Sequence, residues 1–162
     1  PGPHYVGDIR DLLESGQVWD ALIGFPPCTY LCSSGLHWNT RRPERAAQTD
    51  AGLAFVRYLM DTRAARFVAI ENPVGCISSR IRKPDQIIQP WQFGHGETKA
   101  TCLWLKNLPK LLPTNIVEGR EARIHKMPPG PDRWKERSRT LEGVAQAMAD
   151  QWGNARQMEI AA

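Results

Sequence analysis

The chain has 162 residues, a formal net charge of +4 and a charged fraction of 23%, which are ordinary values for a globular protein. This length predicts a single domain over 1–162, and no apolar run approaches the roughly 20 residues that a membrane-spanning helix needs. The sequence therefore excludes an integral membrane protein, and without a signal-peptide pattern we expect a cytoplasmic protein with no membrane partner. Its mild basic charge is compatible with a polyanionic partner.

The predicted elements begin with a strand end over residues 4–9 and a short helix over 10–15 that Gly16 ends. Residues 20–25 follow as a nearly continuous apolar run. Such a run is typical of a strand that is covered on both faces, as in a parallel sheet. We therefore expect this strand to be buried.

Two prolines stop the apolar run. Neither Pro26 nor Pro27 can donate a backbone hydrogen bond to a neighbouring strand, so the strand must end there. In open α/β sheets, ligands bind beyond the carboxyl ends of the strands. Cys28 is the first residue after the prolines, and it therefore lies where such a fold performs its chemistry.

The four cysteines, Cys28, Cys32, Cys76 and Cys102, could form two disulfides. The chain is neither small nor rich in cysteine, however, and each cysteine lies in or beside an apolar segment. We therefore expect free thiols in a reducing compartment. A metal site built from these thiols and His37 would fit no familiar zinc spacing, and we predict no metal. Apart from Cys28, we interpret the cysteines as structural residues.

A polar, basic loop over 36–45 leads into a helix over 46–60. Residues 66–73 then repeat the earlier pattern, with a buried apolar strand followed by polar residues and a proline at its exit. Strand, helix and strand in this order predict parallel pairing through a right-handed crossover. Cys28 and Glu71 should then emerge at the same edge of the sheet.

The second half of the chain has weaker patterns. Residues 75–100 are predicted to be irregular, and 101–106 to form another strand. Residues 107–140 are rich in proline and charge, which predicts an extended, irregular surface. The apolar spacing over 141–152 predicts a final amphipathic helix.

A thiol and a carboxyl group at one sheet edge can act on the same substrate. A thiol attacks as its thiolate, so its site must lower its pKa or accept its proton. A carboxyl group in a dry pocket stays protonated near neutral pH and donates a hydrogen bond. Cys28 and Glu71 therefore suit covalent activation of a flat, electron-poor ring, in which the thiolate adds to one carbon and the acid contacts a ring nitrogen.

Two segments, Phe25-Pro26-Pro27-Cys28 and Ile70-Glu71-Asn72-Pro73-Val74, resemble the catalytic motifs of DNA cytosine-5 methyltransferases. Val6-Gly7-Asp8-Ile9 resembles the family's motif whose acid faces the adenine of S-adenosylmethionine. Over 4–153 the chain is most similar to small phage and prophage proteins of this type, from bacterial or phage-infected cells. It shares with them the runs Cys-Thr-Tyr-Leu-Cys-Ser-Ser-Gly, Glu-Asn-Pro-Val-Gly-Cys-Ile-Ser and Arg-Lys-Pro-Asp-Gln-Ile-Ile-Gln-Pro.

The resemblance implies a Rossmann-like methyltransferase sheet, mostly parallel with helices on both faces. It implies that Cys28 adds to carbon 6 of cytosine, while Glu71 contacts ring nitrogen 3 and the amino group. Carbon 5 would then attack the methyl group of S-adenosylmethionine, and loss of the carbon-5 proton would expel the cysteine. Asn72 and Pro73 would set the pose of Glu71. The residues implied at the cofactor are Asp8, Ile9, Pro26 and Pro27.

Two features depart from the family pattern. The family's glycine-rich cofactor loop precedes the Asp8 motif by several tens of residues, whereas this sequence starts at Pro1, so we expect an N-terminally shortened sheet. Only 107–140 is available as a minimal target-recognition region, and Arg137-Ser-Arg139 is the nearest match to the family's arginine motif.

Two alternative functions stay open. One is a catalytically reduced binding module for a nucleic acid or nucleotide, and the other is modification of a free pyrimidine nucleotide with another one-carbon donor.

DNA is the expected partner, with its target cytosine flipped out of the duplex or single-stranded. Three basic runs interleaved with aromatic side chains favour contact with phosphates, and Trp38 or Trp91 could stack on the base or fill the gap that it leaves. The predicted substrate and DNA residues are Ser33, Ser34, Trp38, Arg41, Arg42, Arg80, Arg82, Lys83, Arg137 and Arg139.

Overall fold

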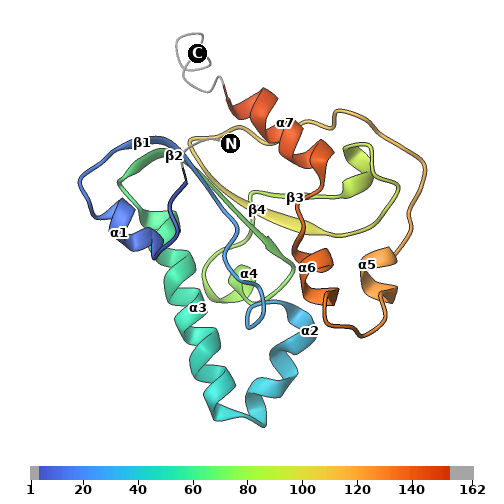
Figure 1. Cartoon of the computed structure of the whole chain (residues 1–162), viewed down its shortest axis with the longest axis horizontal. Coiled ribbons are helices and arrows are strands. Elements are labelled where there is room, and N and C mark those ends of the chain that lie inside the picture. Colours follow the sequence, from blue (N-terminus) through green and yellow to red (C-terminus); the bar gives the residue numbers. More distant parts are fainter. Residues whose placement is uncertain (1–3, 154–162) are drawn as a thin grey trace.

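A four-stranded sheet in the order β1-β2-β4-β3 forms the centre of the molecule (Figure 1). The computed structural model describes residues 4–153. Strand β1 pairs parallel with β2, whereas β4 pairs antiparallel with both β2 and β3. The fold is therefore a mixed α/β fold. The strands are β1 (Trp19–Gly24), β2 (Ala65–Pro73), β3 (Gln86–Ile88) and β4 (Thr101–Lys106).

The prediction of a mostly parallel sheet is wrong for these strands, because two of the three neighbouring pairs are antiparallel. A continuous apolar run indicates burial on both faces but carries no signal for the direction of a strand. Strand β4 enters between β2 and β3 and runs against both of them. Because β2 and β3 are both antiparallel to β4, the strands β1, β2 and β3 run in the same direction.

The predicted strand–helix–strand unit is confirmed. Strand β1 lies beside β2 in parallel, with Ala21 opposite Phe67 and Gly24 opposite Ile70. Between them the chain forms α2 (Ser33–Leu36), the 3-10 helix η1 (His37–Thr40) and the long helix α3 (Pro43–Asp61). Helix α3 begins three residues before the predicted start, because proline is well suited to the first turn of a helix.

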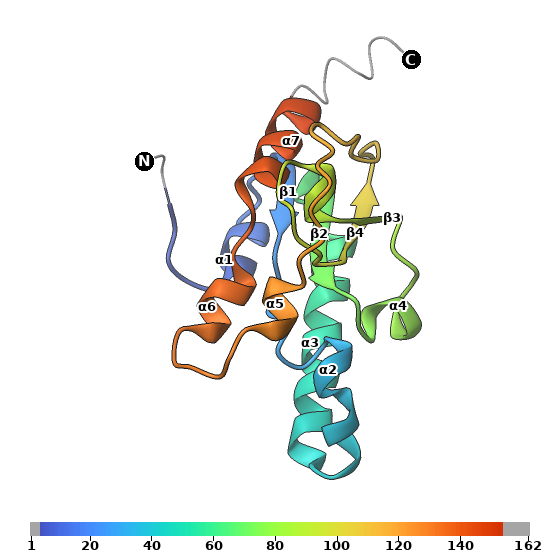
Figure 2. The same cartoon turned by 90° about the vertical axis from the view of Figure 1, so that its right-hand side faces the viewer.

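Alternate residues of β2 belong to two separate hydrophobic cores. Val68 and Ile70 belong to a cluster with helix α3, whereas Ala69 belongs to a second cluster with the last helix, α7 (Glu142–Trp152). Successive side chains of a strand point to opposite faces, so each face of β2 has its own core. In Figures 1 and 2, α7 lies above the sheet and α3 extends below it. The buried helical residues are Leu53, Val56 and Leu59 of α3 and Val144, Ala147, Met148 and Trp152 of α7.

The N-terminal segment differs from its prediction, because residues 4–8 form no strand. The chain instead enters α1 (Ile9–Leu13), whose first turn is capped by Asp8. The Asp8 carboxylate accepts a hydrogen bond from the Arg10 backbone N–H at 3.0 Å, which satisfies one of the free donors of a helix start. Gly16 follows with a φ of 84°, a conformation that glycine adopts readily.

The segments predicted to be irregular contain short elements. Within 75–100 the chain forms α4 (Ile77–Arg80), strand β3 and the 3-10 helix η2 (Pro90–Gln92). A strand of three residues is too short for its periodicity to be recognised. Residues 107–140 are extended, as predicted, except for α5 (Arg123–Lys126) and α6 (Arg133–Ser138). None of the helices within residues 4–153 combines the length and apolar character that crossing a membrane requires.

Candidate active site

The exits of β1 and β2 meet at one edge of the sheet, as predicted from the two proline-terminated strands. Asn72 connects them directly: its side-chain amide donates a hydrogen bond to the Pro26 carbonyl oxygen at 2.8 Å. Asn72 is only 1% exposed, so this bond forms away from solvent. Leaving a buried amide without a hydrogen-bond partner costs free energy. The bond therefore fixes the ends of the two strands relative to each other.

The backbone ties the same two segments together further on. The Cys76 N–H donates to the Leu31 carbonyl at 2.9 Å, and the Ser33 N–H donates to the Val74 carbonyl at 3.1 Å. Gly75 lies so close to the Leu31 carbonyl that a Cβ atom there would clash with it. Only glycine allows this approach, which brings the loop after Cys28 against the exit of β2.

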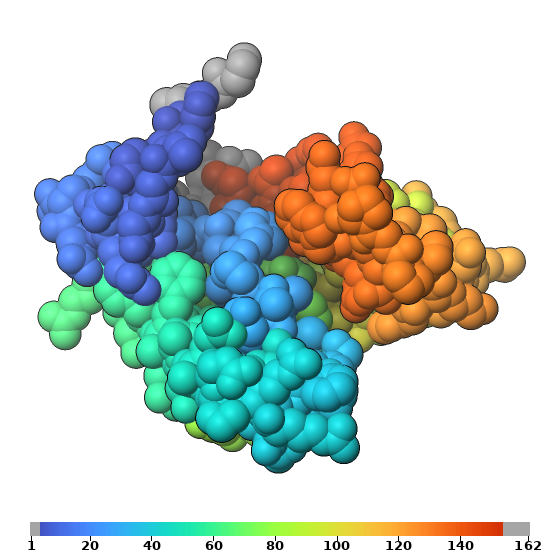
Figure 3. Space-filling view, turned by 60° about the horizontal axis from the view of Figure 1, so that its bottom comes forward, coloured from blue at the N-terminus to red at the C-terminus, as the bar shows by residue number. Residues whose placement is uncertain are grey.

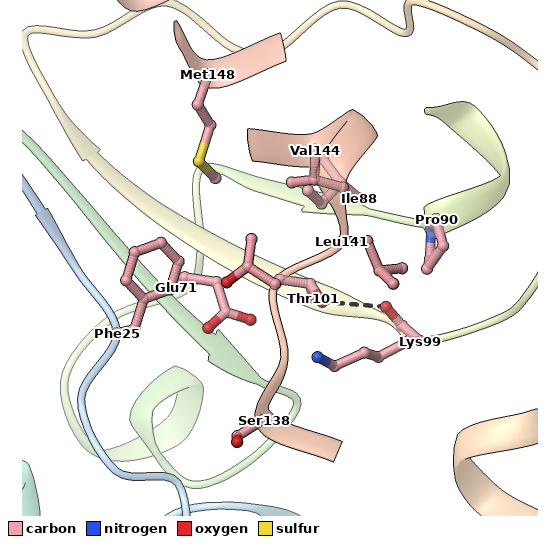
Figure 4. A pocket seen from close by; sticks show the side chains of 11 residues that line it. Phe25, Glu71, Ile88, Pro90, Lys99, Thr101, Ser138, Leu141, Val144 and Met148 are labelled. Atoms are coloured by element: carbon pink, nitrogen blue, oxygen red, sulfur yellow. Dashed lines mark hydrogen bonds between the residues drawn. The ribbon is translucent and has the colours of Figure 1, made fainter. Parts of the chain in front are cut away.

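Glu71 points into a small, open pocket at this edge of the sheet (Figure 4). Burial raises the pKa of its carboxyl group above the ordinary value, and the positive charge of Lys99 opposes this shift. The environment therefore shifts the carboxyl toward its protonated form. The pocket is lined by Phe25, Glu71, Ile88, Pro90, Lys99, Thr101, Ser138, Thr140, Leu141, Val144 and Met148.

Lys99 and Thr101 were not predicted as site residues. Figure 4 shows the side chains of Lys99 and Glu71 pointing into the same space, and the Thr101 hydroxyl donates to the Lys99 carbonyl at 3.1 Å. They reach the site because β4 is antiparallel to β2, so that Thr101 at its start lies opposite Pro73 at the end of β2. The sequence contains no signal for this direction, and hence none for these two residues.

Cys28 lies beside the pocket and is not among its lining residues. Its thiol is half-buried and interacts with Cys32. The hydrogen bond to Cys32 raises the pKa of Cys28, and burial and the charges of Cys32 and Glu71 add to the shift. Because the charge of Glu71 acts on Cys28, the structure brings the predicted nucleophile and acid within electrostatic range of each other.

Cys32, which we interpreted as structural, is the more acidic of the two thiols. Its hydrogen bond with Cys28 lowers its pKa to about 5, with help from Ser34 and from the positive charge of Arg137. The Ser34 hydroxyl lies 3.2 Å from the Cys32 sulfur. The environment therefore favours a thiolate at Cys32 beside a protonated thiol at Cys28. All four cysteines are free thiols, as predicted.

The predicted DNA residues fall into separate groups. Arg137, on α6, acts on the Cys32 thiol, and the Arg139 carbonyl accepts a hydrogen bond from the Lys99 amine at 3.3 Å. The Trp38 ring, on η1, lies under the guanidinium groups of Arg41 and Arg42, at 5.6 and 5.2 Å from its centroid. In Figure 1 this group lies at the lower end of the molecule, where α2 turns into α3.

The third basic group lies on and after α4 and is held by contacts within the protein. Arg80 pairs with Asp50 at 3.0 Å, and Arg82 pairs with Asp85 at 2.8 Å. Lys83 follows them in the turn before β3. None of Arg80, Arg82 and Lys83 lines the Glu71 pocket.

The predicted cofactor residues lie in two places, before α1 and at the exit of β1. The Asp8 carboxylate caps α1 and pairs with the Arg10 side chain at 3.3 Å, while Ile9 packs against the α3 core. Pro26 and Pro27 lie at the exit of β1, and none of these four residues lines the Glu71 pocket. No set of three or more His, Cys, Asp or Glu side chains within residues 4–153 is arranged to hold a metal ion.

No family model matches this chain, and neither a curated protein nor a solved structure matches it significantly.

Proposed function

We propose that this protein is a DNA cytosine-5 methyltransferase-like enzyme, in which Cys28 attacks a cytosine that is held by Glu71. The Asn72–Pro26 hydrogen bond of 2.8 Å carries the proposal, because it fixes the exits of two parallel strands so that a thiol and a buried carboxyl share one edge. Strands β1, β2 and β3 run in one direction, and the site lies beyond the carboxyl ends of β1 and β2. This supports a Rossmann-like sheet, in which ligands bind at that edge.

Glu71 contributes as a neutral acid. Burial favours its protonated form, which can donate a hydrogen bond to ring nitrogen 3 of cytosine and take up charge as the ring is attacked. Phe25, Val144 and Met148 line this small pocket with apolar surface, against which a flat ring could pack once the pocket widens to admit it. Lys99 adds a positive charge in the same space, which favours an electron-rich oxygen or a phosphate.

Cys28 must lose its proton before it attacks. The raised pKa of Cys28 makes its thiolate the less populated form, and transfer of its proton to the neighbouring Cys32 sulfur would supply that form. The Cys28 sulfur then bonds to carbon 6, and carbon 5 becomes electron-rich while Glu71 supports ring nitrogen 3. Loss of a proton from carbon 5 restores the double bond and expels the cysteine. In the proposed reaction S-adenosylmethionine would supply the methyl group for carbon 5.

Basic side chains flank the Cys28 loop on two sides and support DNA as the partner. Figure 3 shows this loop, in blue, between the cyan start of α3 and the orange segment of α5 and α6. Arg41 and Arg42 belong to the first flank, and Arg137 and Arg139 to the second. Cations on both sides of a site can contact phosphates on both sides of a target nucleotide.

Hydrogen exchange at cytosine carbon 5 tests the proposal without a methyl donor. Addition of Cys28 to carbon 6 lets carbon 5 take a deuteron from heavy water, and elimination then leaves deuterium in the base. We expect single-stranded DNA to gain deuterium with the wild-type protein, and Cys28→Ser to lose at least about a thousandfold in rate. The variant Cys102→Ala, which removes a core thiol, serves as the control. Exchange that survives in folded Cys28→Ser would exclude covalent attack by this residue.

A free pyrimidine nucleotide is a second candidate substrate. A neighbouring open pocket shares Lys99 and Leu141 with the Glu71 pocket. It is also lined by Arg139 and by Arg123, which pairs with Glu97 at 3.1 Å. With the base beside Glu71, a phosphate could reach these cations. Exchange measured on free deoxycytidine monophosphate in competition with the oligonucleotide separates the two substrates. Faster exchange on the free nucleotide would favour this candidate over DNA.

A further inference from the structure

The loop between β1 and α2 brings two thiols together beside the Glu71 pocket. The Cys28 carbonyl oxygen accepts hydrogen bonds from the backbone N–H groups of Leu31 and Cys32, both at 3.0 Å. The bond between residues 28 and 32 closes one helical turn, in which residues four apart have Cα atoms separated by about 6 Å. A disulfide spans Cα separations of about 4.4–6.8 Å but needs Cβ atoms about 3.5–4.5 Å apart, so a bond between Cys28 and Cys32 requires a small local shift from the Cβ separation of about 5–6 Å in such a turn.

The surroundings of Cys32 favour its thiolate. The Ser34 hydroxyl lies 3.2 Å from its sulfur, and Arg137 supplies a positive charge from α6. These groups and Cys28 lower the pKa of Cys32 to about 5, whereas the pKa of Cys28 is raised. Both thiols are only half-buried, so a small molecule can reach them. An acidic, accessible thiol beside a second thiol is the arrangement found in redox-sensitive cysteines.

We propose that Cys28 and Cys32 form a site of reversible oxidation, at which a peroxide converts the two thiols into a disulfide. The Cys32 thiolate attacks one peroxide oxygen, the O–O bond breaks, and the departing hydroxide takes a proton from water or buffer. Cys32 is then a sulfenic acid. The Cys28 sulfur attacks the Cys32 sulfur, the S–O bond breaks, and the hydroxide leaves as water with the Cys28 proton. The two thiols lose two electrons, and the peroxide is reduced to two molecules of water.

The consequence for activity rests on the proposed function. A disulfide occupies the sulfur of Cys28, so the oxidised protein cannot add to a pyrimidine until a thiol reductant restores the pair. Cys76 is the competing partner, because it lies close enough to Cys32 for the charge of Cys32 to act on it. Its thiol is buried, however, which makes it less accessible than Cys28.

Peptide mapping separates these pairings. Trypsin places Cys28 and Cys32 together in the fragment 11–41, Cys76 in 67–80 and Cys102 in 100–106. The folded protein is treated with hydrogen peroxide, alkylated and digested. We expect fragment 11–41 to resist alkylation and to be lighter by two hydrogen atoms, while the other two fragments are alkylated and dithiothreitol reverses the change. A cross-link between 11–41 and 67–80, or a fragment 11–41 with both thiols still alkylated, would overturn the proposal.

The pH dependence tests the role of Cys32. The oxidation rate should change little above about pH 6 and fall as the pH drops through about 5, because the thiolate of Cys32 is then lost. Cys32→Ser should slow oxidation of the remaining Cys28 thiol about tenfold near neutral pH and give a rate that keeps rising toward alkaline pH. Cys102→Ser should behave as wild type. A wild-type rate that rises steadily from about pH 6 to 8 contradicts the assignment.

The experiments distinguish a wrong assignment of the oxidation site from a wrong proposed function. Disulfide formation is measured by mass and requires no activity on cytosine. If the disulfide forms in a protein that shows no carbon-5 exchange before oxidation, the oxidation site is supported and the proposed function is refuted. If exchange continues in fully oxidised protein, the inference that oxidation blocks Cys28 is overturned.

Discussion

Strands β1 and β2 are parallel neighbours with similar apolar sequences, yet their environments differ. Strand β2 lies between β1 and β4, and its Val68 and Ile70 are 1% and 0% exposed. Strand β1 lies at the edge of the sheet formed by residues 4–153, and its Trp19 and Ile23 are 37% and 39% exposed. The prediction that the first strand is covered on both faces is therefore wrong.

The difference shows how each half of the site is positioned. Glu71 and Asn72 belong to a strand with packed neighbours on both sides, so the core itself fixes them. Cys28 follows an exposed edge strand, and its loop depends on contacts with the exit of β2. These are the Asn72–Pro26 bond and the backbone bonds of Leu31. Packing in the core therefore positions the Glu71 carboxyl group, whereas hydrogen bonds to a neighbouring strand position Cys28.

Among the changes that compare the two strands, the largest expected effect concerns the acid on the packed strand. Glu71→Gln keeps the shape of the side chain but removes its acidic proton, and we expect carbon-5 exchange to fall by at least about a hundredfold. Retained exchange in this variant would mean that Glu71 does not act as the acid.

The same variant reports on the raised pKa of Glu71. Because burial raises this pKa, the folded state favours the protonated carboxyl, and its stabilising contribution is lost as the pH rises above the ordinary glutamate pKa of 4.5. The wild-type protein should therefore lose stability relative to Glu71→Gln as the pH increases from about 4 to 8. Urea unfolding at several pH values measures this, and a constant difference in the free energy of unfolding would contradict it.

The tether between the two strands is the next target. Asn72→Ala leaves the Pro26 carbonyl without its partner and creates a cavity, so we expect the free energy of unfolding to fall by about 2–3 kcal/mol. Exchange at carbon 5 should fall as well, because the Cys28 loop loses its link to Glu71.

Asn107 offers a matched control for Asn72. Its amide donates to the Arg66 carbonyl at 2.9 Å, but at an exposed position, and its φ of 58° suits glycine. Asn107→Gly should cost less than about 1 kcal/mol and leave exchange unchanged. Equal losses in the two variants would show that the Asn72 bond has no special role.

A pair of identical substitutions tests the contrast between the strands directly. Ile70→Val on β2 removes a methyl group from the core and should cost about 1 kcal/mol. Ile23→Val on β1 removes the same group from a partly exposed side chain and should cost less than about 0.5 kcal/mol. Urea unfolding compares them, and the contrast fails if Ile23→Val is the more damaging change.

The smallest expected signal concerns the cofactor. Because Asp8 caps α1 and pairs with Arg10, we expect no saturable heat when this chain is titrated with S-adenosylmethionine. Calorimetry with S-adenosylhomocysteine as a parallel titrant measures this. A saturable heat that disappears in Asp8→Ala would show that the segment binds the cofactor after all.

The sequence by itself determined the local features of the site: two apolar runs, the prolines that stop them, and the order of Cys28 and Glu71 with a helix between them. These features depend on neighbouring residues, and together they predict that the two strands lie parallel and end at one edge.

Tertiary structure decided the rest, because hydrophobic periodicity records burial but not the order or direction of strands. Lys99 enters the pocket only because β4 runs against β2, and the pKa of Cys32 is lowered by Cys28 and Ser34 in its own loop and also by Arg137, more than a hundred residues away. Strand β1 is exposed for the same reason, since its apolar sequence cannot specify whether a neighbour covers its outer edge.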